Sequence, residues 1–219
     1  ALLALRSRFK AADPAWGLSH VTLGDLVGYA FVRTLARHPG ANATLEHGVW
    51  RVFEHVHLAI AVDTPRGLLV PVVRHADALT LAEFAAESKR VAQAAIAGSI
   101  DPDLLAGGTV TVSNLGAFGV ESFTPILNAP QVAILGVDAV TPRATVNPDG
   151  SLAVRQTIGF SLTADHRVLD GADAARLLQD LCRTVRDLDL LLAAGQNGLA
   201  AGQNGLAAGQ NGLAAGKEG

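Results

Sequence analysis

The sequence predicts a mixed α/β domain built around one large sheet, and three observations lead to this fold class. Segments with apolar residues at helical spacing alternate along the chain with short β-branched segments that favour strands. Hydrophobic residues make up 49% of the 219 residues and charged residues 17%, so the chain can bury a sizeable core. No internal boundary is visible before residue 194. We therefore expect one domain over residues 1–193.

Four segments have the pattern of helices. They are residues 2–10, 22–37, 80–97 and 172–192. In the second, apolar residues recur every three or four positions, and His38-Pro39-Gly40 follows as a stop signal. Thr80 and Glu83 have the spacing of a capping box at the start of the third helix.

The expected strands lie between these helices. They are residues 49–53, 55–62, 68–73, 109–113, 132–137, 143–146 and 152–163. Residues 63–67 read as a turn, and Asn147-Pro148-Asp149-Gly150 as the turn of a hairpin between the last two strands.

The last 26 residues, 194–219, differ from the rest of the chain. The heptad Ala-Gly-Gln-Asn-Gly-Leu-Ala occurs three times in succession from Ala194. Each heptad holds one Leu and two Gly, which disfavours both a helix and a coiled coil. We interpret this tail as a linker or an engineered segment and exclude it from the functional argument.

Composition excludes several classes of function. A net charge of -3 without a Lys/Arg-rich run does not support binding to nucleic acid or to an anionic membrane. A single cysteine, Cys182, excludes an internal disulfide and a multi-cysteine zinc site, and it favours a reducing compartment such as the bacterial cytoplasm. No apolar run approaches the ~20 residues that span a bilayer. The chain contains no Met, which suggests a fragment or a processed product.

The segment 165–171, Asp-His-Arg-Val-Leu-Asp-Gly, is the first candidate site. Ionisable side chains gather there between a predicted strand and a predicted helix, where burying them without a purpose is costly. His166 has a side chain whose ordinary pKa suits a general base. Judged by pattern alone, a solvated loop with ordinary helix caps fits equally well.

The segment 109–119 is the second candidate. Its strand ends at Ser113 and Asn114, and a glycine-containing loop follows, in which Gly116 permits close approach of a ligand. The Ser113 hydroxyl could donate a hydrogen bond to an oxyanion. A Gly-x-Ser-x-Gly elbow is absent, which argues against a hydrolase nucleophile. Taken alone, a turn bonded to its own backbone is the simpler interpretation.

A metal site receives little support. His55 and His57 would share one face of the expected strand 55–62, as two metal ligands could. No Cys, Asp or Glu at a suitable spacing completes the set. We therefore expect no metal and interpret the pair as surface histidines.

Four stretches, in consistent order, resemble the catalytic domain of the dihydrolipoamide acyltransferases of 2-oxo acid dehydrogenase complexes. They are residues 62–72 (Val-Asp-Thr-Pro-Arg-Gly-Leu-Leu-Val-Pro-Val), 111–116 (Thr-Val-Ser-Asn-Leu-Gly), 123–137 (Phe-Thr-Pro-Ile-Leu-Asn-Ala-Pro-Gln-Val-Ala-Ile-Leu-Gly-Val) and 165–171. The resemblance covers residues 1–192 and is nearest to the acetyltransferases of pyruvate dehydrogenase. It implies a chloramphenicol-acetyltransferase-like fold, with a large mixed sheet flanked by helices.

The resemblance also implies roles for particular residues. His166 would be the general base that deprotonates a thiol of dihydrolipoamide or coenzyme A, and Ser113 would stabilise the oxyanion. Asp170 would hold the site together through a pair with an arginine, whose place Arg6 occupies. Gly171 would support the site, and Asn114 and Gly116 would contact substrate. Lipoamide, carried on a separate domain, and coenzyme A would be substrates, and no metal would be needed.

Members of this family are trimers with the active site between subunits, and many trimers assemble into cubic or dodecahedral cores. The resemblance therefore implies a homotrimer, with 2-oxo acid dehydrogenase and dihydrolipoamide dehydrogenase as further partners of the full-length protein. The N-terminal arm that precedes Leu2 in relatives is missing, and the repetitive tail replaces their C-terminus, so a cage is less expected than a trimer. Branched-chain acyl transfer, another acyltransferase of the same fold and a non-catalytic or engineered scaffold remain alternatives.

Overall fold

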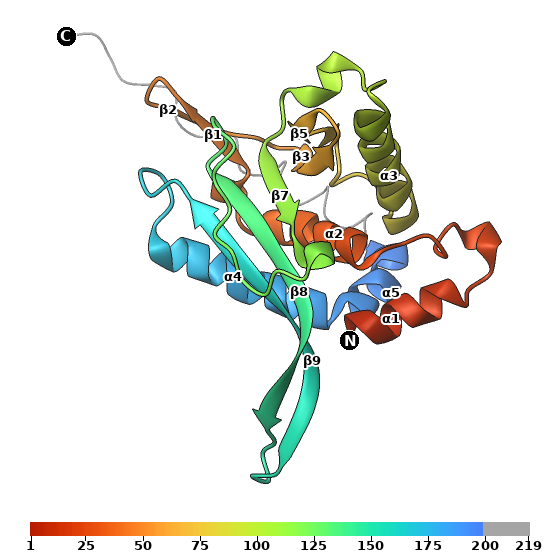
Figure 1. The fold of residues 1–219 in the computed structure, drawn as a ribbon. Coiled ribbons are helices and arrows are strands. Elements are labelled where there is room, and N and C mark those ends of the chain that lie inside the picture. Colours follow the sequence, from red (N-terminus) through yellow and green to blue (C-terminus); the bar gives the residue numbers. More distant parts are fainter. Residues whose placement is uncertain (199–219) are drawn as a thin grey trace. The chain divides into compact units, whose positions relative to one another are not determined.

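A five-stranded mixed sheet forms the centre of residues 1–186 in the computed structural model, which describes residues 1–198 of the chain. The strand order is β6-β3-β7-β8-β9 (Figure 1). The strands span Leu58–Ile60 (β3), Val72–Val73 (β6), Val110–Asn114 (β7), Ala133–Val146 (β8) and Leu152–Ala164 (β9). β3, β7 and β8 are parallel, whereas the edge strands β6 and β9 run antiparallel to their neighbours. This arrangement confirms the predicted large mixed sheet.

Two small antiparallel hairpins accompany the sheet. One pairs Ala43–Glu46 (β1) with Val49–Val52 (β2), and the other pairs Val62–Thr64 (β4) with Gly67–Leu69 (β5). The tip of the first contains His47 and Gly48, both with positive φ, as a tight hairpin turn requires. β1 was not predicted, because it is only four residues long and has no clear alternation.

Two of the helices begin directly after a threonine cap. The α-helices of residues 1–186 span Leu2–Lys10 (α1), Leu23–Leu35 (α2), Leu81–Ala97 (α3) and Gly171–Arg186 (α4). Thr22 caps α2 in a capping box with Asp25, and Thr80 caps α3 with Glu83 in the same way. Short 3₁₀ helices lie at Pro14–Trp16, Pro39–Ala41, Pro102–Leu105 and Gly116–Phe118.

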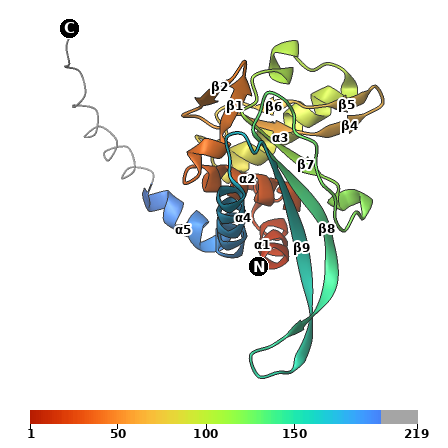
Figure 2. The same cartoon turned by 90° about the vertical axis from the view of Figure 1, so that its left-hand side faces the viewer.

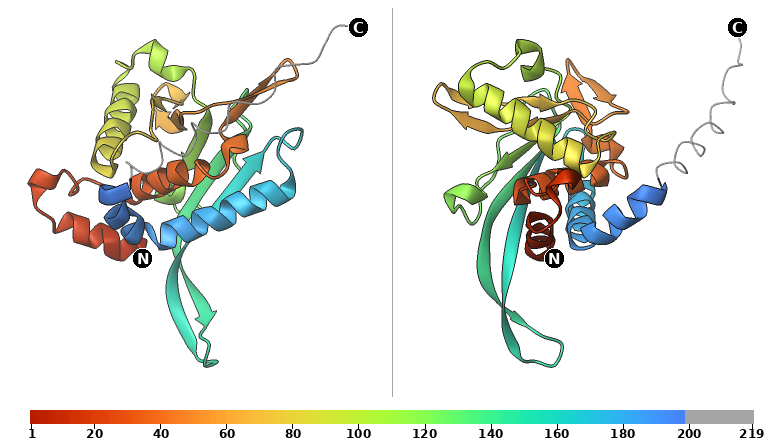
Figure 3. Two further views of the ribbon diagram at one scale, coloured as in Figure 1. Left: turned by 180° about the vertical axis from the view of Figure 1, so that it is seen from behind. Right: turned by 90° about the vertical axis from the view of Figure 1, so that its right-hand side faces the viewer.

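The hydrophobic core lies between the sheet and the two helices α2 and α4. Figures 2 and 3 show both helices on one face of the sheet. α2 is buried over almost its whole length, with Phe31 and Leu35 among the least exposed side chains of the domain. Leu135 of β8 and Leu181 of α4 are fully buried as well. This packing fixes the orientation of β7 and β9, the strands that lead into the two candidate site segments.

β8 and β9 continue beyond the sheet as a two-stranded ribbon (Figure 1). Asp138 and Ala139 together oppose Gly159, which makes a bulge where the ribbon leaves the body of the domain. The sequence patterns predicted two separate strands, 132–137 and 143–146, and this was wrong. The bulge interrupts the alternation that marks a strand, although pairing resumes at Val140 and continues to Val146.

Three further sequence predictions need correction. The expected strand 55–62 is divided into β3 and β4, and residues 68–73 are divided into β5 and β6 around Pro71, which has no N–H to donate. The expected helix 172–192 is two helices, α4 and Leu188–Gly198 (α5), interrupted at Asp187. α5 belongs to the second compact unit of the chain, which begins at Asp187. Most of the repetitive tail, residues 199–219, lies outside the described residues.

Candidate active site

Ser113 is held at the end of an interior strand. β7 pairs with β3 on one side and β8 on the other, and Ser113 lies opposite Gly136 of β8. A Cβ atom on Gly136 would lie 3.0 Å from the Phe123 ring and 3.2 Å from Pro125, so the segment around these two residues covers this face next to Ser113. The Ser113 side chain is half-buried. Its backbone therefore has little freedom, and the hydroxyl is presented from a rigid support.

Asn114 and Gly116 form the turn after β7. Asn114 Oδ1 accepts a hydrogen bond from the backbone N–H of Gly116 at 2.9 Å, which is the self-bonded turn that the sequence also allowed. A Cβ on Gly116 would lie 2.7 Å from the carbonyl oxygen of Asp138, so only glycine fits there. Both residues thus shape the loop behind Ser113. Their expected contacts with substrate stay a prediction.

His166 lies on an exposed loop between β9 and α4. The loop is closed by hydrogen bonds from the N–H groups of Val168 and Leu169 to the carbonyl oxygen of Asp165. His166 Nε2 is 4.0 Å from the position of a Cβ on Gly171, an ordinary van der Waals distance, so the ring lies at the first residue of α4. Within residues 1–198 no hydrogen bond to either ring nitrogen is present. The imidazole is therefore free to bind an incoming group.

Asp165 is the carboxylate that holds this loop. The sequence patterns did not predict this role for it. Arg167 Nε donates to Asp165 Oδ1 at 2.8 Å, and Arg167 Nη2 donates to Oδ2 at 2.5 Å. These bonds hold the pKa of Asp165 below its ordinary value. The backbone N–H of Asp165 also donates to Val132, which attaches the loop to the start of β8. The Asp-x-Arg spacing in the sequence could have indicated this two-bond ion pair, which we call the Asp165–Arg167 fork.

Asp170 and Arg6 do not meet in this chain. Asp170 is exposed at the start of α4, where its carbonyl accepts from Ala174 N–H, and no ion pair involves it within residues 1–198. Arg6 lies on α1 near Asp25, whose pKa is raised by burial although Thr22 and Arg6 act in the opposite direction. The expected pair is therefore not formed. The carboxylate beside Arg6 is Asp25.

Ser113 and His166 lie too far apart in one chain to act on one bond. Gly136 lies opposite both Ser113 and Ser161, so two strand spacings, about 10 Å, separate these serines. Three more residues along β9, another ~10 Å, lead to Ala164, and His166 lies beyond it. A joint site therefore requires His166 and Ser113 from different copies of the chain.

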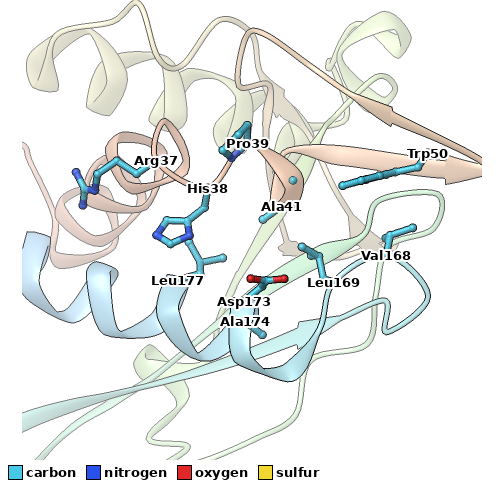
Figure 4. Close-up of a pocket in the computed structure, with 11 residues that line it drawn as sticks. Arg37, His38, Pro39, Ala41, Trp50, Val168, Leu169, Asp173, Ala174 and Leu177 are labelled. Atoms are coloured by element: carbon cyan, nitrogen blue, oxygen red, sulfur yellow. The ribbon is translucent and has the colours of Figure 1, made fainter.

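A cavity of about 280 Å³ lies behind the His166 loop (Figure 4). Val168 and Leu169 line it from the loop, Leu177 from α4, and Trp50 from β2. Its volume is below the usual range for small-molecule sites. We therefore assign no substrate to it.

The two histidines that share a face in the expected strand 55–62 lie away from His166 and Ser113 in sequence, at the entry to β3. His55 and His57 precede β3, in an irregular segment, and do not share a strand face as expected. In the part of the chain that the structure describes, no group of three or more His, Cys, Asp or Glu is placed to hold a metal ion. None of the helices among residues 1–198 is long and apolar enough to cross a membrane.

Comparisons with known proteins agree with this architecture. The family model for the catalytic domain of 2-oxoacid dehydrogenase acyltransferases matches residues 1–193. The dihydrolipoyllysine-residue acetyltransferase component of the Mycobacterium bovis pyruvate dehydrogenase complex is 39% identical over 183 residues, which are 81% of this chain and 33% of that protein. The Staphylococcus aureus counterpart is 34% identical over 193 residues, 87% of this chain and 44% of that protein. The chain thus spans a third to less than half of these relatives.

Solved structures give the same result. The dihydrolipoamide acetyltransferase of Azotobacter vinelandii superposes with a TM-score of 0.81 at 37% identity, covering 87% of this chain and 79% of that chain. A cubic core of a pyruvate dehydrogenase multienzyme complex gives the same TM-score and coverage at 36% identity. A chloramphenicol acetyltransferase, at 15% identity and a TM-score of 0.54, shares the fold. The chain belongs to the family of 2-oxoacid dehydrogenase acyltransferases, of which it carries the catalytic domain.

Proposed function

We propose that this chain transfers an acyl group between dihydrolipoamide and coenzyme A in the core of a 2-oxo acid dehydrogenase complex. The proposal rests on the loop 165–171. In a chain of this family, this loop presents the His166 imidazole at the start of α4, with no hydrogen bond to its ring nitrogens within residues 1–198. The relatives named above are acetyltransferases of pyruvate dehydrogenase complexes, which favours acetyl as the acyl group.

His166 would act as the general base. It would accept the proton of the attacking thiol, and the thiolate would add to the carbonyl carbon of the partner thioester. The tetrahedral intermediate would carry an oxyanion, to which the Ser113 hydroxyl would donate a hydrogen bond. When the intermediate collapses, the carbon–sulfur bond to the other thiol breaks, and that sulfur takes the proton back from His166. Atoms and charge balance without a covalent acyl-enzyme.

The Azotobacter vinelandii enzyme supports these roles. A serine, a histidine and an asparagine have been studied there for their part in catalysis, and that histidine and asparagine are four residues apart, as are His166 and Asp170 here. Asp170 would accordingly be the counterpart of the asparagine and would position the site rather than transfer protons. Gly171 would support the site at the start of α4, and Asn114 and Gly116 would shape the Ser113 loop.

Two copies of the chain would build each site, as in a homotrimer. The separation of Ser113 and His166 within one chain supports this arrangement. The ribbon supports it as well, because Ala144, Val146, Leu152 and Val154 share one of its faces. Val146, Leu152 and Val154 are at least 70% exposed. A two-stranded ribbon with such a face is marginally stable in water, so a neighbouring copy would cover it.

The substrates and partners follow from the same proposal. Lipoamide and coenzyme A would be the two thiol substrates, with the lipoyl group carried on another domain, and no metal would take part. The dehydrogenase and the dihydrolipoamide dehydrogenase of the complex would bind parts of the full-length protein outside this chain. Branched-chain acyl transfer is the second candidate, since a methylene is worth only ~1–3 kcal/mol in pocket selectivity.

Acyl transfer to free dihydrolipoamide tests the proposal. Acetyl-, isobutyryl- and succinyl-coenzyme A would be offered in parallel, with His166→Ala as the control for the chemistry. We expect His166-dependent transfer, fastest from acetyl-coenzyme A. Preference for isobutyryl-coenzyme A would establish the branched-chain alternative. A folded trimer without any transfer would contradict the proposal and favour a non-catalytic scaffold.

A further inference from the structure

A cluster of titratable side chains lies outside the candidate active site, where residues 55–57 run beside residues 75–77. It consists of His55, His57, His75 and Asp77, and we refer to it as the histidine latch. The two segments are joined by hydrogen bonds from Val56 N–H to Asp77 Oδ1 and from Ala76 N–H to the Val56 carbonyl, both at 2.8 Å. The latch thus connects the entry to β3 with the exit from β6.

His57 makes the bond in the latch that depends on its protonation state. Its Nδ1 accepts the backbone N–H of His75 at 3.0 Å, so this nitrogen carries no proton and Nε2 carries the one on the neutral ring. His75 has a φ of 47°, in the left-handed region that is uncommon for residues other than glycine but that histidine adopts more often than most. The bond to His57 therefore helps to hold this less common backbone conformation.

The pKa of His55 is shifted in the opposite direction to that of His57. His55 Nδ1 lies 3.0 Å from Asp77 Oδ2, and this contact raises the pKa of His55. Burial, with the nearby charges of His75 and Arg74, lowers the pKa of His57 from its ordinary value of 6.5. The His75 ring stands between the other two, with centroids 4.8 Å from His55 and 4.7 Å from His57. Asp77 is the carboxylate that faces these cations, and Glu54 acts on His55 from its exposed position.

The latch is also connected to the strand that carries Ser113. His57 N–H donates to Thr109 Oγ1 at 3.0 Å, and Thr109 N–H donates to the His57 carbonyl at 2.9 Å. Thr109 immediately precedes β7, and β3 pairs with β7 from Leu58 onward. A change at His57 therefore reaches the start of β7 through two direct hydrogen bonds.

We propose that the histidine latch is an acid-operated device in which protonation of His57 releases the backbone of His75 from the entry to β3. Protonated Nδ1 is a donor and cannot accept the His75 N–H, and the new charge lies beside His75 and Arg74. The sign follows from linkage: the stabilisation by neutral His57 is present above its unfolded pKa, near 6.5, and is lost as the pH falls through its lower folded value. His55 and Asp77 stay paired over that range and confine the opening to the His57 side.

Amide hydrogen exchange tests the proposal. Protection of the His75 and Thr109 amides, corrected for the intrinsic exchange rate, would be measured from about pH 8 to about pH 5. We expect wild-type protection at His75 to fall by up to roughly tenfold per pH unit between the ordinary pKa of an exposed histidine and the lower folded pKa of His57, and to level off below it. His57→Asn, whose Oδ1 can occupy the place of Nδ1 without titrating, should keep its protection. His20→Asn, at an exposed histidine outside the latch, should behave like the wild type.

Two results would overturn the proposal. One is an equal loss of protection in His57→Asn and in the wild type. The other needs no variant: nitrogen chemical shifts of the wild type at neutral pH report which ring nitrogen is protonated, and a proton on His57 Nδ1 would exclude the acceptor role. Unprotonated Nδ1, together with acid-dependent exchange at His75, would support the latch. Acyl transfer is not part of either measurement, so the outcome is independent of the proposed function.

Discussion

The two halves of the candidate site are held in different ways. Ser113 lies in a strand that is paired on both sides, with a covered face and a glycine-tight turn behind it. His166 lies on an exposed loop after an edge strand, and its support comes from the Asp165–Arg167 fork and the buried Leu169. The oxyanion donor is thus fixed by the sheet, whereas the base depends on local contacts. The comparison suggests that substitutions around Ser113 change stability and activity together, and those around His166 change activity alone.

Loss of the base should have the largest effect. His166→Ala is expected to lower kcat/KM for acyl transfer by ~10²–10⁴, since no other group would take the thiol proton. Because the side chain is exposed in the protomer, its removal should leave the melting temperature almost unchanged. Steady-state kinetics and thermal unfolding measure both quantities. Activity close to the wild type would contradict the mechanism.

Loss of the oxyanion donor should come next. Ser113→Ala is expected to lower kcat by ~10²–10³, because the developing charge loses one hydrogen bond. Ser113→Thr, which keeps a hydroxyl, is the matched variant and should lose less. An equal loss in both variants would indicate that packing on β7, rather than the hydroxyl, is what matters.

Mixing the two inactive variants tests whether the halves belong to different copies. After joint unfolding and refolding of His166→Ala with Ser113→Ala in equal amounts, random assembly would leave roughly a quarter of the sites with both groups intact. We expect activity to return to about that fraction of the wild type. Separate refolding of each variant provides the control. No recovery in assemblies shown to contain both chains would place both groups in one chain.

Substitution of Gly136, which lies opposite Ser113, should lower stability and activity together. A Cβ on Gly136 would press on the Phe123 ring at 3.0 Å and on Pro125 at 3.2 Å. Gly136→Ala is therefore expected to cost about 1–3 kcal/mol in the free energy of unfolding and roughly tenfold in activity, as overpacked sites do. Urea unfolding and steady-state kinetics on the same preparation measure the free energy of unfolding and the activity. Lost activity at full stability would break the proposed contrast between the halves.

Removal of the Asp165–Arg167 fork should have the smallest effect on activity. Arg167→Ala is expected to reduce kcat/KM by only a few-fold, roughly three to ten, through a less ordered loop, with little change in stability because the Arg167 side chain is exposed. The pKa of Asp165 is depressed, so its contribution is present above the unfolded pKa, near 3.8, and is lost as the pH falls through the lower folded value. The variant and the wild type should thus show the same pH profile above about pH 5.

Much of the fold follows from local chemistry. The capping residues Thr22 and Thr80, the hairpin turn around Asn147 and the apolar periodicity of α2 each specify structure within a few residues. Predictions were wrong where a local irregularity broke the period, as at the Asp138 bulge, at Pro71 and at Asp187. At those positions long-range pairing or packing decides the course of the backbone.

By itself, the sequence determined the mixed α/β class, most of the helices, and the family, through motifs of fixed residue type and spacing. Only the tertiary structure decided which of the candidate residues meet. It brought Arg6 to the neighbourhood of Asp25, and His57 to the backbone of His75. It also placed Ser113 and the strand before His166 two strand spacings apart, with β8 between them. The physical reason is that spacing along a chain encodes hydrogen bonds and turns over a few residues, whereas contacts between distant segments depend on strand order and register, which only the packed sheet establishes.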